Sequence, residues 1–256
     1  MKPEIAFFDI DGTLMSLTTR KMSGNVAEAL VRLRESGCRI FLATGRAPFT
    51  LPEFENISFD GKMCFNGSFA ADGEGVIYSS PLDKADISRV LKNAEAIGQP
   101  VIAATAESRG YTFYSPLLDD YIQFSKAPCG PLETENLEEE DIYQITVPTE
   151  KDLEDQLLEG TSHFAVTRWW EKAVDIIPVT GGKAAAMERI LEHYGISREN
   201  TAAFGDSTND IDMLQYAGIG IAMGNADGSV KKEADYIADT CENDGVAHAL
   251  EDFGWI

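Results

Sequence analysis

The sequence has few of the residues that build disulfide frameworks or metal sites made of thiolates and imidazoles. Its 256 residues include four cysteines and three histidines, and no two cysteines lie close together in the chain. This spacing matches neither a zinc site nor a disulfide framework, and it fits a reducing compartment. No apolar run approaches the length of a membrane-spanning helix, and no signal-peptide core precedes Asp9. We therefore expect a cytoplasmic protein with no membrane partner.

Positive charge is also scarce. The chain has 21 Lys and Arg residues against 43 Asp and Glu residues, which gives a formal net charge of -22. Such a balance repels a phosphate backbone and disfavours a nucleic-acid partner. If the ligand is a small anion, the binding site must supply positive charge locally, from a metal ion, a few cationic side chains and helix N-termini. Hydrophobic residues make up 44% of the chain, which is ample for a sizeable core.

The most informative stretch lies near the start of the chain. Ile5 to Phe8 is an uninterrupted apolar run, as in a strand buried on both faces of a parallel sheet, and it is followed by Asp9, Asp11 and Gly12. Ligands of open α/β sheets bind beyond the carboxyl ends of the strands. The two carboxylates point the same way on an extended backbone. They are candidates for chemistry, although Asp, Gly and Thr are also ordinary residues of an Asx-type turn.

Further strands of the same kind follow. Residues 23–36 have the pattern of a helix. Residues 39–43 have that of a buried strand, which is followed by Thr44, Gly45 and Arg46. Residues 201–204 have that of another strand, which is followed by the polar run 205–210. Strands that alternate with helices predict an α/β fold with a doubly wound, Rossmann-like parallel sheet. Asn-Gly and Asp-Gly pairs between residues 62 and 78 predict hairpin turns.

The pattern changes between Pro81 and Pro178. Here a helix over 82–98 is followed by short strands, a loop rich in proline and acid from about 115 to 141, and further strands over 142–147, 163–169 and 173–177. The strand-helix alternation resumes directly afterwards. We therefore expect a discontinuous core of residues 1–80 and 179–256, with an inserted α+β domain of residues 81–178.

The polar clusters that accompany the core strands share one chemistry. Four acids, one amide, one hydroxyl and one lysine are typical of phosphoryl transfer with Mg2+, because carboxylates are hard ligands that suit this ion. The residues are Asp9 and Asp11, Thr44, Lys183, and Asp206 with Asn209 and Asp210. Taken singly, Lys183 fits a solvated helix surface and Thr44 fits a helix cap. The coincidence of all four clusters favours a common site.

These motifs resemble the haloacid dehalogenase superfamily, specifically its Cof-type sugar phosphatases with a type IIB cap. The resemblance covers both halves of the expected core in the family order, whereas the insertion matches only in position and in strand-helix character. Ala184 departs from the glycine that often follows the family lysine, and a helix tolerates this change. The matching segments are 9–14, 43–46, 66–67, 183, 205–210, 222–226 and 243–247.

The resemblance implies a role for each matching residue. Asp9 would be the nucleophile that forms an aspartyl-phosphate, and Asp11 the general acid and base. Mg2+ would be bound by Asp9, Asp11 (through its backbone carbonyl), Asp206 and Asp210, with Asp210 a direct or an outer ligand. The residues expected to hold the substrate or its phosphate oxygens are Thr44, Gly45, Arg46, Lys183 and Asn209.

The resemblance thus implies a Mg2+-dependent phosphatase of small phosphate monoesters, with sugar phosphates as the expected substrates and the inserted cap setting specificity. Two alternatives stay open: a phosphomutase that shares every core residue, and a non-catalytic phosphoacceptor signalling module. We expect a monomer or a weak homo-oligomer whose partner is a small phosphorylated molecule. The candidate cap residues that face substrate are Glu107, Arg109, His163, Arg168, Trp169 and Glu171.

Overall fold

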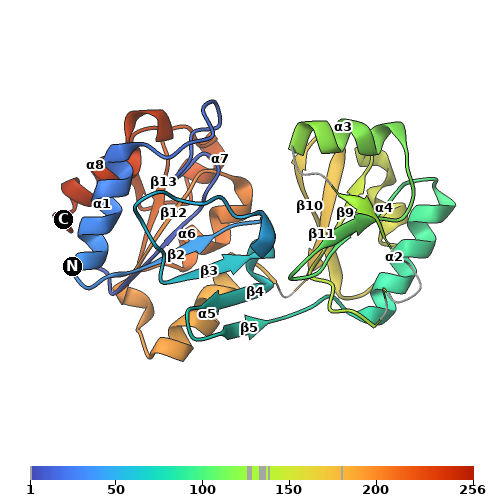
Figure 1. The fold of residues 1–256 in the computed structure, drawn as a ribbon, viewed down its shortest axis with the longest axis horizontal. Coiled ribbons are helices and arrows are strands. Elements are labelled where there is room, and N and C mark those ends of the chain that lie inside the picture. Colours follow the sequence, from blue (N-terminus) through green and yellow to red (C-terminus); the bar gives the residue numbers. More distant parts are fainter. Residues whose placement is uncertain (1, 126–128, 133–136, 138, 180) are drawn as a thin grey trace. The chain divides into compact units, whose positions relative to one another are not determined.

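The computed structural model describes residues 2–125, 129–132, 137, 139–179 and 181–256, apart from the side chain of Trp169 (Figure 1). The chain divides into two compact units. The first unit consists of Met1–Gly45, Pro52–Ser79 and Gly182–Ile256, and the second unit of Arg46–Leu51 and Ser80–Gly181. No helix in the described part of the chain has the length and apolar character that crossing a membrane requires.

The first unit is built on a mixed eight-stranded sheet. Its strands lie in the order β14-β13-β12-β1-β2-β3-β4-β5, parallel from β14 to β3 and antiparallel from β3 to β5. The hairpins predicted between residues 62 and 78 are therefore confirmed. The strands are β1 (Ile5–Phe8), β2 (Arg39–Ala43), β3 (Gly61–Cys64), β4 (Phe69–Asp72), β5 (Val76–Ser79), β12 (Thr201–Gly205), β13 (Ile219–Ala222) and β14 (Tyr236–Ile237).

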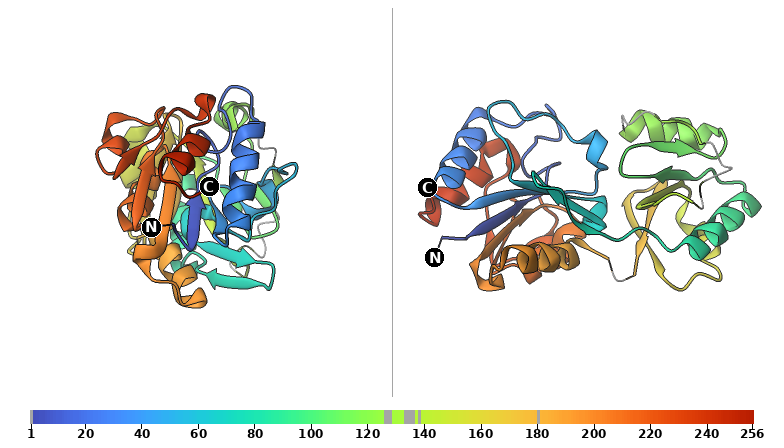
Figure 2. Two further views of the ribbon diagram at one scale, coloured as in Figure 1. Left: turned by 90° about the vertical axis from the view of Figure 1, so that its left-hand side faces the viewer. Right: turned by 60° about the horizontal axis from the view of Figure 1, so that its bottom comes forward.

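Helices cover both faces of this sheet. Helices α1 (Gly24–Glu35) and α8 (Gly245–Asp252) pack on each other at one face, and α5 (Lys183–Tyr194) and α6 (Ile211–Tyr216) pack at the other (Figure 2). The short α7 (Gly228–Lys231) follows β13. Side chains alternate along β1, so that Ile5 and Phe7 belong to the core cluster formed with α5 and α6. The doubly wound parallel core expected from the sequence is thus confirmed.

The second unit has a six-stranded, mainly antiparallel sheet with the order β10-β11-β9-β6-β7-β8. Helices α2 (Lys84–Ala96) and α4 (Glu154–Leu157) bury their apolar side chains against one face, and α3 (Pro116–Ser125) packs on the other. The strands are β6 (Ile102–Ala104), β7 (Arg109–Tyr111), β8 (Gly130–Pro131), β9 (Gln144–Pro148), β10 (Phe164–Trp170) and β11 (Ala173–Pro178).

Helix α3 corrects the sequence analysis, which expected a loop in this region. Pro116 occupies the first turn, where its fixed φ and missing N–H are tolerated, and the Ser115 hydroxyl accepts a hydrogen bond from Leu118 N at 3.1 Å. Leu118 and Tyr121, one turn apart, bury the helix against the sheet. Residues 126–128, 133–136 and 138 of the expected loop lie outside the described residues.

Candidate active site

The site is built where neighbouring parallel strands end. Strand β1 lies between β12 and β2, with Ile5 opposite Thr201 on one side and Arg39 on the other. Asp9, Thr44 and Asp206 each follow directly after one of these three strands. Because the carboxyl ends of parallel strands share one edge of a sheet, the register brings these side chains to that edge.

Lys183 is the centre of the ionic contacts at this edge. Its side chain is fully buried, and its Nζ donates to Asp9 Oδ1 at 2.8 Å, to Asp210 Oδ1 at 2.5 Å and to the carbonyl of Ala43 at 2.8 Å. Burial alone would lower the pKa of this ammonium. The charges of Asp210 and Asp9 outweigh burial and hold the pKa above its ordinary value. Lys183 is therefore a permanently charged cation in the interior, not the solvated surface residue that its position in the sequence also allowed.

Three carboxylates surround this one ammonium. Burial, then the charges of the other two acids, raises the pKa of Asp9 well above its ordinary value, against the opposing charge of Lys183. Burial and the charge of Asp210 raise the pKa of Asp206 to about 7. The buried Oδ1 of Asp206 has no hydrogen-bond partner among the described residues. The acids of this edge are thus only partly neutralised by the protein itself.

Asp210 is engaged by protein at both oxygens. Oδ1 accepts from Lys183, and Oδ2 accepts from the backbone N–H groups of Asp206 and Ser207, each at 3.0 Å. The bond from Ser207 N is one half of a capping box, in which the Ser207 side chain accepts from the Asp210 backbone in return, and this box fixes the turn after β12. Asp210 therefore orients both Lys183 and the backbone that carries Asp206.

Asp11 lies apart from the three clustered acids. Its Oδ1 pairs with the guanidinium of Arg20 at 3.0 Å, and 29% of its side chain is exposed. Directly after Asp11, Gly12 adopts φ +88°, and a Cβ there would overlap the carboxylate of Asp206. Glycine is therefore required at this position for both conformation and space. Nothing in the sequence indicated Arg20, whose backbone is left-handed (φ 56°).

The residues expected to hold phosphate oxygens divide between the two units. Thr44 is buried in the first unit, and Asn209 Nδ2 donates to Asn66 Oδ1 at 2.9 Å. A Cβ on Gly45 would lie 2.9 Å from the same Asn66 oxygen. Arg46 belongs to the second unit, where its guanidinium donates to the carbonyl of Thr50 at 3.1 Å.

The structure adds a residue to which the sequence analysis gave no role. Asn225 Nδ2 donates to the carbonyl of Gly12 at 2.9 Å and to Asp206 Oδ2 at 3.2 Å, while its Oδ1 accepts from Cys241 N at 2.8 Å. It thus ties the turn after β1 to the turn after β12. The only signal in the sequence was its place in the motif segment 222–226.

The second unit contains the residues that were expected to face the substrate. Most of those with described contacts bind other residues of the same unit. Arg168 Nε pairs with Glu154 at 2.7 Å, and its NH1 also donates to the carbonyls of Thr149 and Trp170. The backbone N–H of His163 donates to Asp86 Oδ2 at 2.9 Å. Glu107 and Glu171 are exposed, Arg109 lies on β7, and the Trp169 side chain is outside the described residues.

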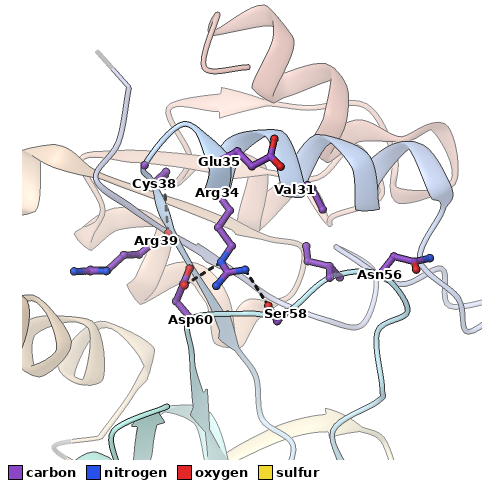
Figure 3. A pocket seen from close by; sticks show the side chains of 10 residues that line it. Val31, Arg34, Glu35, Cys38, Arg39, Asn56, Ser58 and Asp60 are labelled. Atoms are coloured by element: carbon purple, nitrogen blue, oxygen red, sulfur yellow. Dashed lines mark hydrogen bonds and ion pairs between the residues drawn. The ribbon is translucent and has the colours of Figure 1, made fainter.

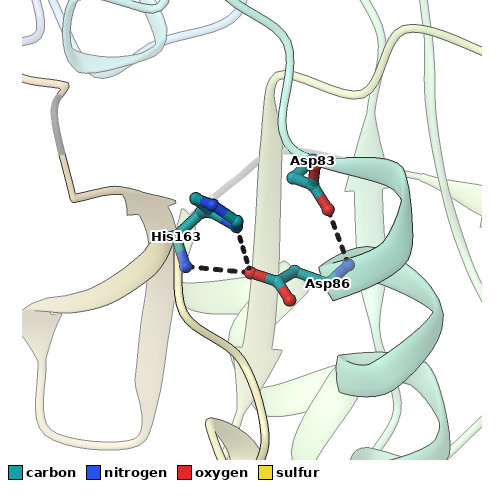
Figure 4. A group of neighbouring side chains, drawn as sticks. All are labelled: Asp83, Asp86 and His163. Atoms are coloured by element: carbon teal, nitrogen blue, oxygen red, sulfur yellow. Dashed lines mark hydrogen bonds and ion pairs between the residues drawn. The ribbon is translucent and has the colours of Figure 1, made fainter.

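Two groups among the described residues could bind a metal ion: Asp9 with Asp206 and Asp210, and Asp83 with Asp86 and His163. In the second group Asp83 Oδ1 caps α2 by accepting from Ala85 N and Asp86 N (Figure 4). Asp86 accepts from backbone N–H groups and faces the His163 ring. These contacts explain why the side chains of the second group lie close together.

The first group fits a divalent cation. Its donors are hard carboxylate oxygens, one of them buried without a hydrogen-bond partner, and burial together with the neighbouring acids raises the pKa values of Asp9 and Asp206. A hard cation such as Mg2+ suits these donors. We therefore place the candidate metal site at Asp9, Asp206 and Asp210.

A sizeable cavity of the first unit lies elsewhere. It has a volume of about 730 Å³ and is lined by the end of α1 and by the segments that lead into β2 and β3 (Figure 3). Within it Arg34 donates to Asp60 at 3.0 Å and to Ser58 at 2.9 Å. This cavity is at the amino ends of the strands, the edge opposite the acidic cluster, so we do not assign the chemistry to it.

Comparisons with known proteins agree with this geometry. The model of the haloacid dehalogenase-like hydrolases matches residues 6–250. The chain is 30% identical to YkrA of Bacillus subtilis, which is named as a phosphatase, over 99% of both chains. A phosphatase of the haloalkanoate (HAD) superfamily from Bacteroides thetaiotaomicron superposes with a TM-score of 0.93 and 29% identity, covering 100% of this chain and 96% of the other.

A HAD subclass IIB sugar phosphatase superposes with a TM-score of 0.87 and 30% identity over the full length of both chains. The resemblance drawn from the motifs is thus confirmed over the inserted segment as well as the core. The chain belongs to the haloacid dehalogenase-like hydrolase family and is a phosphatase of its Cof-type, type IIB group.

Proposed function

We propose that the protein hydrolyses small phosphate monoesters, sugar phosphates in particular, through an aspartyl-phosphate on Asp9 and with the help of Mg2+. One observation carries the proposal. A buried lysine holds the carboxylate of Asp9 at the carboxyl end of the central strand. Two further acids lie beside it, and the nearby cationic side chains do not fully balance the negative charge of the three. Such a site suits a nucleophile that works beside a cation.

In the first step an oxygen of Asp9 attacks the phosphorus atom. A bond forms between this oxygen and phosphorus as the bond between phosphorus and the ester oxygen breaks, and Asp11 donates its proton to the departing oxygen. The alcohol then leaves as a neutral molecule. The Asp11 side chain is partly exposed, and Arg20 holds one of its oxygens at 3.0 Å, a contact that favours the carboxylate needed as the base of the second step.

In the second step a water molecule attacks the phosphorus of the aspartyl-phosphate. Asp11, now a carboxylate, accepts the proton of that water, and the bond between phosphorus and Asp9 breaks. Inorganic phosphate leaves, Asp9 is again a carboxylate, and Asp11 again carries its proton. The two steps need no reactant other than the ester and water.

Lys183, Thr44 and Asn209 would hold the phosphoryl oxygens and stabilise the negative charge that spreads over them in the transition state. Mg2+ bound by Asp9, Asp206 and Asp210, and by the backbone carbonyl of Asp11, would favour the ionised carboxylates and polarise the phosphate as a Lewis acid. In the protein alone, burial and the charges of the other acids raise the pKa of Asp9, and the charge of Lys183 opposes this rise only in part.

The substrate class is proposed on two grounds. A HAD subclass IIB sugar phosphatase matches the chain along its whole length. The inserted segment of residues 81–178 would act as the specificity cap over a catalytic core of residues 1–80 and 179–256, and aromatic faces and hydrogen-bonding side chains suit a sugar. In the second unit, the exposed aromatic residues Phe113 and Tyr114 offer such faces.

A panel of phosphate esters tests the proposal. Purified protein with Mg2+ should release inorganic phosphate from hexose and pentose phosphates faster than from nucleotides. A faster rate on nucleotides would refute the substrate class while leaving the phosphatase assignment. Incubation with a sugar bisphosphate separates the remaining alternative, since a phosphomutase would produce isomerised monophosphate in place of free phosphate. Trapping of labelled phosphate on Asp9 after acid quench would test the intermediate.

A further inference from the structure

The turn after β3 has an unusual backbone. Phe65, Asn66 and Gly67 follow one another with φ values of 51°, 53° and 100°, and all three are buried. Only glycine adopts such values without strain, and two non-glycine residues in succession are rare. The surrounding contacts must therefore hold this turn in place.

The turn contacts three of the polar segments at the candidate active site, all within the first unit. Asn66 N donates to the carbonyl of Thr44 at 3.1 Å. The Asn66 amide lies against the backbone of Gly45, where a Cβ would come within 2.9 Å of Oδ1 and 3.2 Å of Nδ2. A Cβ on Gly67 would overlap the carbonyl of Gly182, the residue just before α5 and its buried lysine.

The fourth contact is made by the side chain. Asn66 Oδ1 accepts a hydrogen bond from Asn209 Nδ2 at 2.9 Å, across 143 residues of sequence. The side chain of Asn66 is 7% exposed, so this bond is shielded from water. Because Asn66 Oδ1 accepts one hydrogen of the Asn209 amide, the plane of the Asn209 amide is fixed. The second hydrogen of Asn209 Nδ2 is left for another acceptor.

We infer that Asn66 is a positioning residue for phosphate binding: it orients the Asn209 amide and the Thr44–Gly45 backbone so that both meet the phosphate oxygens. This inference rests on the proposed function, since Thr44 and Asn209 hold phosphate only if the substrate is a phosphate ester. Asn66 itself need not contact the substrate. The left-handed turn exists to bring one side chain between two segments that are far apart in the chain.

Asn66→Gly tests the inference, because glycine accepts the left-handed backbone and removes only the amide. The measured quantity is the dissociation constant of inorganic phosphate, determined by calorimetry in Mg2+. Asn66→Gly should weaken phosphate binding by roughly tenfold, the usual effect of one shielded hydrogen bond. Its matched control is Asn56→Gly, at an exposed residue of the first unit with φ 63°, which should leave binding unchanged.

A double-mutant cycle distinguishes positioning from a general structural effect. Asn209→Ala should weaken phosphate binding about as much as Asn66→Gly does. The double variant should have about the same dissociation constant as either single variant. Independent contributions would instead multiply to about a hundredfold, and that result would overturn the inference. Thermal unfolding of each variant should match that of the Asn56→Gly control within a few degrees.

Gly45→Ala gives a second, independent test. Its Cβ should displace the Asn66 amide and weaken phosphate binding in the otherwise unchanged protein, but should have no further effect in the Asn66→Gly background, where the space is free. An equal loss in both backgrounds would contradict the proposed packing. If the unsubstituted protein neither binds phosphate nor hydrolyses phosphate esters, the proposed function fails first. If it does both and the cycle is additive, the role of Asn66 alone fails.

Discussion

Replacing Asp206 by asparagine should stabilise the metal-free protein above neutral pH. Burial and the charge of Asp210 raise the pKa of this carboxyl from its ordinary 3.8 to about 7. The folded protein therefore binds this proton more tightly than the unfolded chain does. Between these two pKa values the folded state holds more protons, so the free energy of unfolding falls as the pH rises.

The size of the effect follows from the same values. The interval from 3.8 to about 7 corresponds to a cost of about 4 kcal/mol for the folded state once the carboxyl is ionised. Asparagine is nearly the same size, carries no charge, and can keep the contact with Asn225. Asp206→Asn should thus gain up to about 4 kcal/mol at about pH 8 and almost nothing at about pH 4.

Urea unfolding in the presence of chelator, followed at both pH values, measures this difference. Asp244→Asn is the control with the opposite sign, because hydrogen bonds from Ser23 and Asn25 lower the pKa of Asp244. Asparagine accepts the left-handed backbone of this residue, so the control should be destabilised at both pH values, because the lowered pKa keeps the Asp244 carboxylate ionised in the folded protein at about pH 4 as well as at about pH 8. Saturating Mg2+ should stabilise the unsubstituted protein and not Asp206→Asn. A variant no more stable than the unsubstituted protein at high pH in chelator would refute the electrostatic reasoning.

Three further outcomes are expected. Asp9→Asn should lower turnover more than about a thousandfold, because an amide is not a phosphoryl acceptor, while circular dichroism stays unchanged; near-normal activity in a clean preparation would exclude Asp9 as nucleophile. Chelation should abolish phosphate release and added Mg2+ should restore it, and full activity after exhaustive chelation would argue against the metal site. Arg168→Ala should destabilise the second unit by about 2–4 kcal/mol, because it breaks a half-buried ion pair with Glu154 and several hydrogen bonds to carbonyls. The order in which the variant prefers different phosphate esters should stay unchanged. A changed order of preference with unchanged stability would place Arg168 at the substrate.

The central part of the sheet could be predicted from the sequence because each of its buried strands is an apolar run that ends abruptly in polar residues. Ile5–Phe8 before Asp9 and Thr201–Gly205 before Asp206 show this pattern, and the parallel topology then brings their ends together. Helix α3 was missed because its buried stripe is short, with Leu118 and Tyr121 as its two buried residues. Local pattern therefore predicts an element best where burial is extensive.

Contacts made across the chain could not be predicted in this way. The amide bond between Asn66 and Asn209 and the bond from Asn225 to Gly12 join segments more than a hundred residues apart. Nothing near these asparagines in sequence indicates a partner, because the register of the folded sheet alone brings the segments together. Side chains that position others are thus harder to find from sequence than those that carry charge.

The place of β1 in the middle of the sheet has a consequence for the synthesis of the protein. This strand leaves the ribosome before the other strands of its sheet, yet one of its two neighbours, β12, begins only at Thr201. The second unit is formed almost wholly from the continuous segment 80–181 and can fold in the meantime. Until β12 emerges, Ile5–Phe8 remains an apolar strand with an unpaired edge, which favours association between nascent chains. The large excess of acidic residues opposes that association, because nascent chains that carry the same negative charge repel one another until β12 pairs with β1.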